Sequence, residues 1–141
     1  MKNTIARLLV FSFSLFTYFG GNYNPPPADF PLTLPAGFKA ETVVESLGRN
    51  RHIAVNSNGD IYVKLEIPKD KKGIIVLRKV DGIYKTVNSF GNYGGTGIAI
   101  KGGWLYASSD NAVYRYKFNG QNEIDNPDAP ETIITGLVSK M

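Results

Sequence analysis

Residues 94–120 read GGTGIAIKGGWLYASSDNAVYRYKFNG and decide the fold class. This stretch holds three short apolar runs rich in β-branched and aromatic residues, which favour strands. The runs cover residues 97–100, 104–107 and 112–118. Gly, Ser, Asp and Asn cluster between the runs, where a chain reversal needs residues that tolerate positive φ. The stretch therefore predicts a three-stranded antiparallel meander, and Glu131–Thr135 predicts a fourth strand after a loop.

The same pattern occurs once earlier in the chain. The earlier runs cover residues 52–55, 61–65, 73–80 and 84–90, with a turn at Asp81–Gly82 and a longer polar loop over 68–72. A four-stranded unit that repeats at roughly 40 to 45 residues is typical of a β-propeller blade. We therefore expect an all-β chain with about two four-stranded antiparallel blades. Blade one is predicted at about 50–90 and blade two at about 95–137, within a partial propeller over 36–141.

The first 21 residues have the pattern of a signal peptide. Lys2 and Arg7 precede the apolar run Leu8–Phe19, which is too short to span a bilayer because a spanning helix needs about 20 residues. A buried core helix is the alternative interpretation. The pattern predicts export to the periplasm or outside the cell, without stable membrane insertion beyond the leader.

A proline-rich segment follows the leader over residues 22–35, and it predicts an extended linker because proline fixes φ and removes a hydrogen-bond donor. The next segment alternates apolar and polar residues from Phe38 to Val44, which predicts a half-buried strand.

The composition excludes several classes of site. The chain has no cysteine, so disulfides, thiolate zinc sites and a cysteine nucleophile are excluded, and a single histidine argues against a zinc site. The net charge is only +4, and no basic stripe with interleaved aromatics occurs. We therefore expect no nucleic-acid partner.

An ordered set of motifs resembles a known family. The motifs lie at Leu34–Lys39, Arg51–Val63, Gly94–Ala99, Leu105–Ser108, Ala112–Tyr116 and Pro130–Leu137. Together they resemble the opening of sorbosone dehydrogenase-type proteins, in the soluble quinoprotein glucose/sorbosone dehydrogenase family. The resemblance implies a six-bladed propeller that binds pyrroloquinoline quinone (PQQ) and calcium. It also implies oxidation of a sugar hydroxyl or aldehyde by hydride transfer to the quinone, with a separate electron acceptor.

The resemblance places the catalytic histidine and the quinone and calcium sites of that family beyond residue 141. It therefore implies an N-terminal fragment of a PQQ-dependent sugar dehydrogenase that is inactive alone. No catalytic, cofactor-binding or metal-binding residue is assigned within the chain. The alternative function is a non-enzymatic exported β-propeller-like binding module, because propellers serve many functions.

Three residues are candidates for substrate binding. His52, at the start of an inner strand, is expected to face the central channel or to pack at its mouth. The resemblance places Asn92 where glucose-oxidising relatives have a substrate-contacting glutamine, although a turn residue with positive φ is the alternative. Thr96 is a weaker candidate of the same kind. Gly94 and Gly95 are expected to form a tight entry to the inner strand.

Other polar and aromatic residues have simpler interpretations. Arg49 and Arg51 can offer donors to an anionic ligand or lie solvated beside the first inner strand. The acidic loop with Glu123 is expected to be solvated, because its spacing matches no EF-hand pattern. The four aromatic residues expected to pack between blades are Trp104, Tyr106, Tyr114 and Tyr116.

Overall fold

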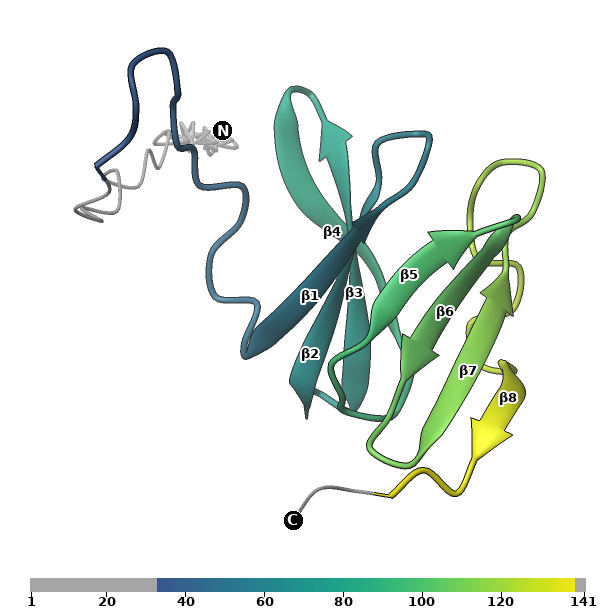
Figure 1. Cartoon of the computed structure of the whole chain (residues 1–141). Helices are drawn as coiled ribbons and strands as arrows, with labels where there is room; N and C mark the ends of the chain where they lie inside the picture. The colour runs from purple at the N-terminus through teal and green to yellow at the C-terminus, as the bar shows by residue number, and fades with distance from the viewer. Residues whose placement is uncertain (1–32, 139–141) are drawn as a thin grey trace, which may run out of the picture. The chain divides into compact units, whose positions relative to one another are not determined.

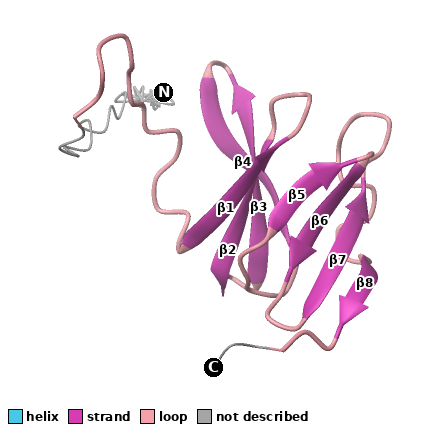
Figure 2. Ribbon diagram, in the orientation of Figure 1, coloured by secondary structure: helices cyan, strands magenta, loops and turns pink. Residues whose placement is uncertain are grey.

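The computed structural model describes residues 33–138, and from Leu34 onward these belong to one compact unit. Figure 2 shows strands and loops and no helix in this described part. Among residues 33–138 no helix is therefore long and apolar enough to cross a membrane. The predicted signal peptide over residues 1–21 and most of the predicted linker over 22–35 lie outside the described residues, so export stays a prediction.

Eight strands form two antiparallel sheets in which neighbours in sequence are neighbours in space (Figure 1). The first sheet consists of β1 (Asn50–Val55), β2 (Ile61–Lys69), β3 (Lys72–Val80) and β4 (Ile83–Phe90). The second sheet consists of β5 (Ile98–Lys101), β6 (Trp104–Ser108), β7 (Ala112–Lys117) and β8 (Glu131–Thr135). The predicted all-β class and the two four-stranded meanders are confirmed. Closure into a six-bladed ring stays a prediction.

Tight turns fix the register of the hairpins. Asp81 and Gly82 have φ of 53° and 82°, and Gly102 and Gly103 have φ of 57° and 79°. Two consecutive residues with positive φ form the two-residue turn whose twist matches antiparallel strands. The predicted reversals at these positions are confirmed.

The polar loop predicted over residues 68–72 is wrong. β2 continues to Lys69, β3 begins at Lys72, and only Asp70 and Lys71 form the turn, with φ of 51° and 61°. Pro68 is tolerated in β2 because it lies beyond the pairing of β1, which ends where Asn50 is opposite Leu65. The ladder with β3 is also irregular between Lys64 and Lys69, so a missing donor disrupts little here.

The strand predicted from Phe38 to Val44 is also wrong. This segment is a loop in which Phe38 is 73% exposed. Alternating polarity does not make a strand when no neighbouring strand satisfies the backbone, and none does so here within residues 33–138. Only Val44 at the end of the segment packs: together with Leu47 further along the chain, it covers the face of the first sheet formed by Val63, Leu65, Ile75 and Leu77.

The main core lies between the two sheets. Its buried members are Tyr62, Ile74, Val76 and Phe90 from the first sheet, and Leu105, Ala107 and Tyr116 from the second. Phe90 meets Tyr116 edge to face, with ring centroids 4.9 Å apart. Each fully buried large apolar side chain contributes about 1.5 to 3 kcal/mol. The sheets are therefore held together face to face, and their two ends remain open for polar groups.

Candidate functional site

The first strands of the two sheets bring the predicted site residues toward each other. β1 and β5 are edge strands of their sheets and lie side by side (Figure 1). The backbone N–H of Gly95 donates to the carbonyl of Glu66 at 3.2 Å, which ties the connection between β4 and β5 to the end of β2. We call the polar residues at this end of the sheets the rim; they are Arg49, Arg51, His52, Glu66 and Thr96.

Two of the three predicted substrate-binding residues meet at the rim. Nδ1 of His52 lies 2.6 Å from the backbone carbonyl oxygen of Thr96. A carbonyl oxygen only accepts, so Nδ1 carries the proton, and in the neutral ring Nε2 is an acceptor. Both side chains are exposed. His52 can therefore accept a hydrogen bond from a ligand hydroxyl beside the hydroxyl group of Thr96.

Arg49 and Arg51 share one carboxylate at the rim. Glu66 lies 3.2 Å from Arg49 and 4.0 Å from Arg51. Both arginine side chains are at least half exposed, so these ion pairs contribute little to stability. Two cations against one anion leave spare donors at this end of the sheets, and the predicted binding of an anionic ligand stays a prediction.

A buried lysine lies on the inner face of β2, next to the rim. Lys64 is 0% exposed, and its Nζ donates to the carbonyls of Tyr93 at 2.8 Å and Gly73 at 3.3 Å. Nζ also lies 4.4 Å from the centroid of the Tyr93 ring. Burial lowers the pKa of Lys64 to about 8, partly offset by the charge of Asp110. Sequence reasoning missed this residue, although alternation from the inward Tyr62 places it inward.

Two glycines allow the rim connection to lie against the first sheet. A Cβ on Gly73 would lie 1.8 Å from the carbonyl oxygen of Tyr93, and one on Gly94 would lie 2.1 Å from that of Glu66. Any side chain at either position would displace the backbone that carries Thr96. The expected tight entry at Gly94–Gly95 is therefore observed.

Asn92 lies in a different place from His52 and Thr96. It lines a cavity of ≈ 260 Å³ with three tyrosines, Tyr93, Tyr114 and Tyr116. The hydroxyls of Tyr93 and Tyr116 are 2.9 Å apart, and the ring centroids of Tyr93 and Tyr114 lie 4.5 Å apart with the rings tilted by 36°. Its predicted contact with substrate is not tested by this placement and stays a prediction.

The aromatic residues divide between the two faces of the second sheet. Tyr114 and Tyr116 pack in the core between the sheets, as predicted. Trp104 instead lies under Arg115, whose guanidinium carbon is 4.1 Å from the ring centroid. Arg115 also donates to Glu131 at 2.7 Å. Trp104 and Arg115 are therefore not part of the core between the two described sheets.

The acidic loop after β7 is not simply solvated. Glu123 accepts a hydrogen bond from Arg78 at 2.9 Å, and Arg78 also binds the carboxylate of Asp60, which is 1% exposed. The Arg78 guanidinium holds the pKa of Asp60 below its usual range. Within residues 33–138 no group of three His, Cys, Asp or Glu side chains could hold a metal ion.

Comparisons with known proteins identify the family. The family model described as TrAA12-like matches residues 32–141. A solved structure described as the calcium structure of Trichoderma reesei carbohydrate-active enzymes family AA12 matches with a TM-score of 0.53 and 27% identity. That match covers 68% of this chain and 25% of the Trichoderma chain, so this chain spans only part of that protein. No curated protein matches.

The predicted sorbosone dehydrogenase-type assignment is therefore wrong. The motifs that suggested it, such as Asn58–Asp60 and Leu105–Ser108, lie in strands and turns that any meander of this kind uses. The family match covers the whole folded part of the chain, including both sheets and the rim. The chain belongs to the TrAA12-like family.

Proposed function

We propose that this chain supplies two adjoining blades of a β-propeller in a PQQ-dependent enzyme that oxidises carbohydrates. The match of the TrAA12-like family over residues 32–141 carries the proposal. The related Trichoderma protein is described as a carbohydrate-active enzyme in a calcium structure. The fold supports the proposal because two meander sheets pack face to face with their first strands side by side, as successive blades do.

In this proposal the rim faces the sugar. Nε2 of His52 accepts from one sugar hydroxyl, and the Thr96 hydroxyl donates to or accepts from a second. Arg49 and Arg51 supply further donors beside them. These residues position the substrate, and none is assigned a proton-transfer step.

The described residues do not fit the cofactors that the family implies. Calcium takes six to eight oxygen ligands, and residues 33–138 hold no cluster of three candidate side chains. Arg49 and Arg51 could meet a carboxylate of PQQ, but Glu66 already partly neutralises them. We therefore assign PQQ binding, calcium binding and the catalytic step to other parts of the complete enzyme.

The experiment that tests this proposed function has two arms. The chain as it stands, mixed with PQQ, calcium, a panel of sugars and an artificial electron acceptor, is expected to reduce no dye. A chimera in which residues 34–138 replace the equivalent quarter of the Trichoderma enzyme is expected to oxidise sugar. Dye reduction by the isolated chain would contradict the assignment of the cofactor sites elsewhere. A folded, cofactor-loaded chimera that oxidises no sugar would contradict the proposed function and favour a binding module.

A variant in the chimera tests the rim directly. His52→Ala removes one exposed hydrogen-bonding ring, so we expect kcat/KM to fall by about tenfold while the melting temperature barely changes. Lys85→Ala is the matched control, because Lys85 is an exposed residue of β4, at the opposite edge of the same sheet. Equal kcat/KM values for the two variants would remove His52 from the substrate site.

A further inference from the structure

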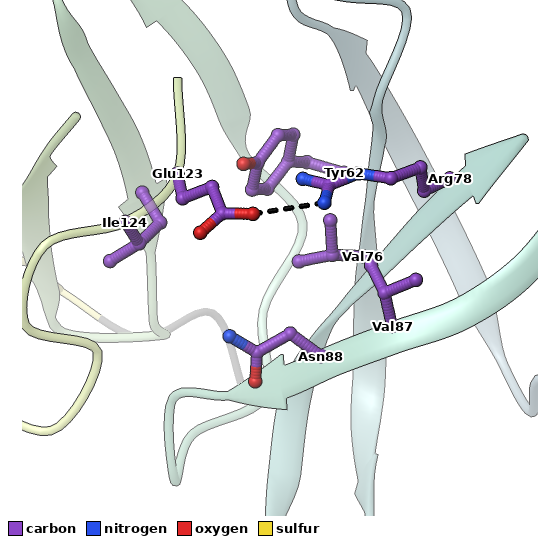
Figure 3. A pocket seen from close by; sticks show the side chains of 7 residues that line it. All are labelled: Tyr62, Val76, Arg78, Val87, Asn88, Glu123 and Ile124. Atoms are coloured by element: carbon purple, nitrogen blue, oxygen red, sulfur yellow. Dashed lines mark hydrogen bonds and ion pairs between the residues drawn. The ribbon is translucent and has the colours of Figure 1, made fainter. Parts of the chain in front are cut away.

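A second polar cavity lies between the first sheet and the loop after β7, away from the rim. It has a volume of ≈ 180 Å³, and its polar lining comes from Tyr62, Arg78, Asn88 and Glu123 (Figure 3). Arg78 of β3 lies opposite Lys85 of β4 in the strand register, close to the β3–β4 turn. Lys64 and the rim lie toward the β2–β3 turn. The cavity and the rim are therefore at opposite ends of the strands.

The Tyr62 hydroxyl is an unused polar group aimed into this cavity. Tyr62 is only 1% exposed, and its hydroxyl makes no hydrogen bond to any residue in the described part of the chain. Every side-chain polar atom that is fully enclosed in this part of the chain has a hydrogen-bond partner. The Tyr62 hydroxyl has none, so it is not fully enclosed, and it borders the cavity that Tyr62 lines. Figure 3 shows the Tyr62 oxygen on the side of Glu123. A nearly buried hydroxyl without a protein partner costs free energy unless water or a ligand satisfies it.

Asn88 supplies a second free group across the cavity from Glu123 (Figure 3). Its Oδ1 accepts from the N–H of Ser89 at 2.8 Å, which orients the amide. Its Nδ2 donates to no residue in the described part and remains available to a ligand in the cavity. One carboxylate oxygen of Glu123 is likewise left over after the other accepts from Arg78.

The cavity wall is held rigidly from both sides. Arg78 binds Asp60 through Nε at 2.9 Å and Nη2 at 2.7 Å, and Glu123 through Nη1 at 2.9 Å. The Asn119 side chain accepts from the N–H of Glu123 at 3.0 Å, which fixes the loop that carries it. The polar groups are therefore positioned before any ligand binds, which reduces the ordering cost of binding.

Charge and shape together select the class of ligand. Asp60, Arg78 and Glu123 sum to one negative charge, and the guanidinium is already occupied by both carboxylates. This balance disfavours phosphate and other anions. The remaining wall is apolar, from Val76, Val87 and Ile124. The cavity of ≈ 180 Å³ is many times the roughly 10 to 15 Å³ that one water needs, so it has room for a ligand of several heavy atoms.

We propose that this cavity binds one ring of a neutral carbohydrate. Ring C–H groups pack on the valines and Ile124, while hydroxyls donate to Glu123 and exchange hydrogen bonds with Tyr62 and Asn88. The inference rests on the lining of the cavity alone and requires no redox activity. It adds a carbohydrate-binding site at the end of the sheets opposite the rim.

The test is an NMR titration of the full chain with D-glucose, D-galactose and D-xylose, each to 100 mM. We expect at least one sugar to give saturable shifts at the Asn88 side-chain amide and the Arg78 Nε–H. Tyr62→Phe keeps the ring and removes the hydroxyl, and we expect it to weaken binding by about tenfold. Asp128→Asn is the matched control, because Asp128 lines the other cavity, and we expect it to bind as the natural protein does.

Three results would overturn the proposal: no saturable shift with any sugar, shifts confined to residues of the other cavity, or unchanged affinity in Tyr62→Phe. Inorganic phosphate is titrated in parallel, and stronger shifts at Arg78 with phosphate than with sugars would also overturn it. If Tyr62→Phe does not fold, the location of the shifts in the natural protein decides. The measurement needs neither PQQ nor calcium, so its failure and that of the redox proposal are separate.

Discussion

Replacing Lys64 by methionine tests the charge that lies buried beside the rim. Lys64 is 0% exposed and has two carbonyl partners and an aromatic ring, but no carboxylate of residues 33–138 lies within hydrogen-bond distance of it. Burial lowers its pKa from 10.5 to about 8. The difference corresponds to about 3 kcal/mol of free energy of unfolding, because each pKa step of one is worth about 1.36 kcal/mol.

The sign of the pH dependence follows from proton binding. The unfolded chain keeps the Lys64 proton up to about pH 10.5, and the folded chain releases it near pH 8. Between these values the unfolded state binds more protons, so stability rises with pH. The full cost of about 3 kcal/mol is present below pH 8 and is gone above about pH 10.5.

Methionine removes this cost and also the donor to two buried carbonyls, Tyr93 and Gly73. Each of the two unsatisfied carbonyls costs at least about 1 kcal/mol, so a combined loss of about 3 kcal/mol nearly cancels the gain at pH 7. At about pH 10.5 only the loss remains, and Lys64→Met is expected to be less stable than the natural protein by about 3 kcal/mol.

Urea unfolding followed by circular dichroism at about pH 7, 8.5, 9.5 and 10.5 measures both free energies. Lys85→Met is the control, because Lys85 is exposed on β4 and its variant should follow the natural protein at every pH. If the curves of Lys64→Met and the natural protein remain parallel across this range, burial does not lower the pKa of Lys64, and the reasoning fails.

Two further substitutions have defined outcomes in the same urea assay. Asp60→Asn weakens the hydrogen bonds between a buried carboxylate and the partly exposed Arg78, and it is expected to cost about 1 to 3 kcal/mol at pH 7. Because the pKa of Asp60 is lowered in the folded state, the difference should shrink as the pH falls below about 4, and a constant difference would contradict the pairing. Gly73→Ala places a Cβ against the Tyr93 carbonyl and is expected to cost at least about 3 kcal/mol. Gly120→Ala, where no atom lies within 4 Å, is the control and should change stability by less than about 1 kcal/mol; equal costs would refute the steric reason.

Most strands could be predicted because their signals are local. Asp81–Gly82 and Gly102–Gly103 stand between apolar runs, and such pairs accept the positive φ that a hairpin turn needs. The segment from Phe38 to Val44 has the same alternation but no neighbouring strand in the described part of the chain. Pairing is a tertiary property, so periodicity alone gave a wrong strand there.

The polar sites were harder to predict because their partners are distant in sequence. Asp60 and Arg78 are held together only by the register of β2 and β3, which places Ile61 opposite Leu77. Glu123 reaches Arg78 from the second sheet, and its loop spacing gave no sign of this contact. His52 and Thr96 were named separately, and the side-by-side edge strands bring them together.

Polar contacts add to the apolar core in holding the two sheets against each other. Side chains of the first sheet bond at one end to the β4–β5 connection between the sheets and at the other end to the β7–β8 loop of the second sheet. Lys64 donates to the Tyr93 carbonyl at one end, and Arg78 donates to Glu123 at the other. Lys64 is buried, so a shift of the sheets that displaced its Nζ would leave this group without a partner at full cost. The Lys64 contact therefore helps to hold the β4–β5 connection, which carries Thr96, against the first sheet, whereas the exposed Arg78–Glu123 pair adds little.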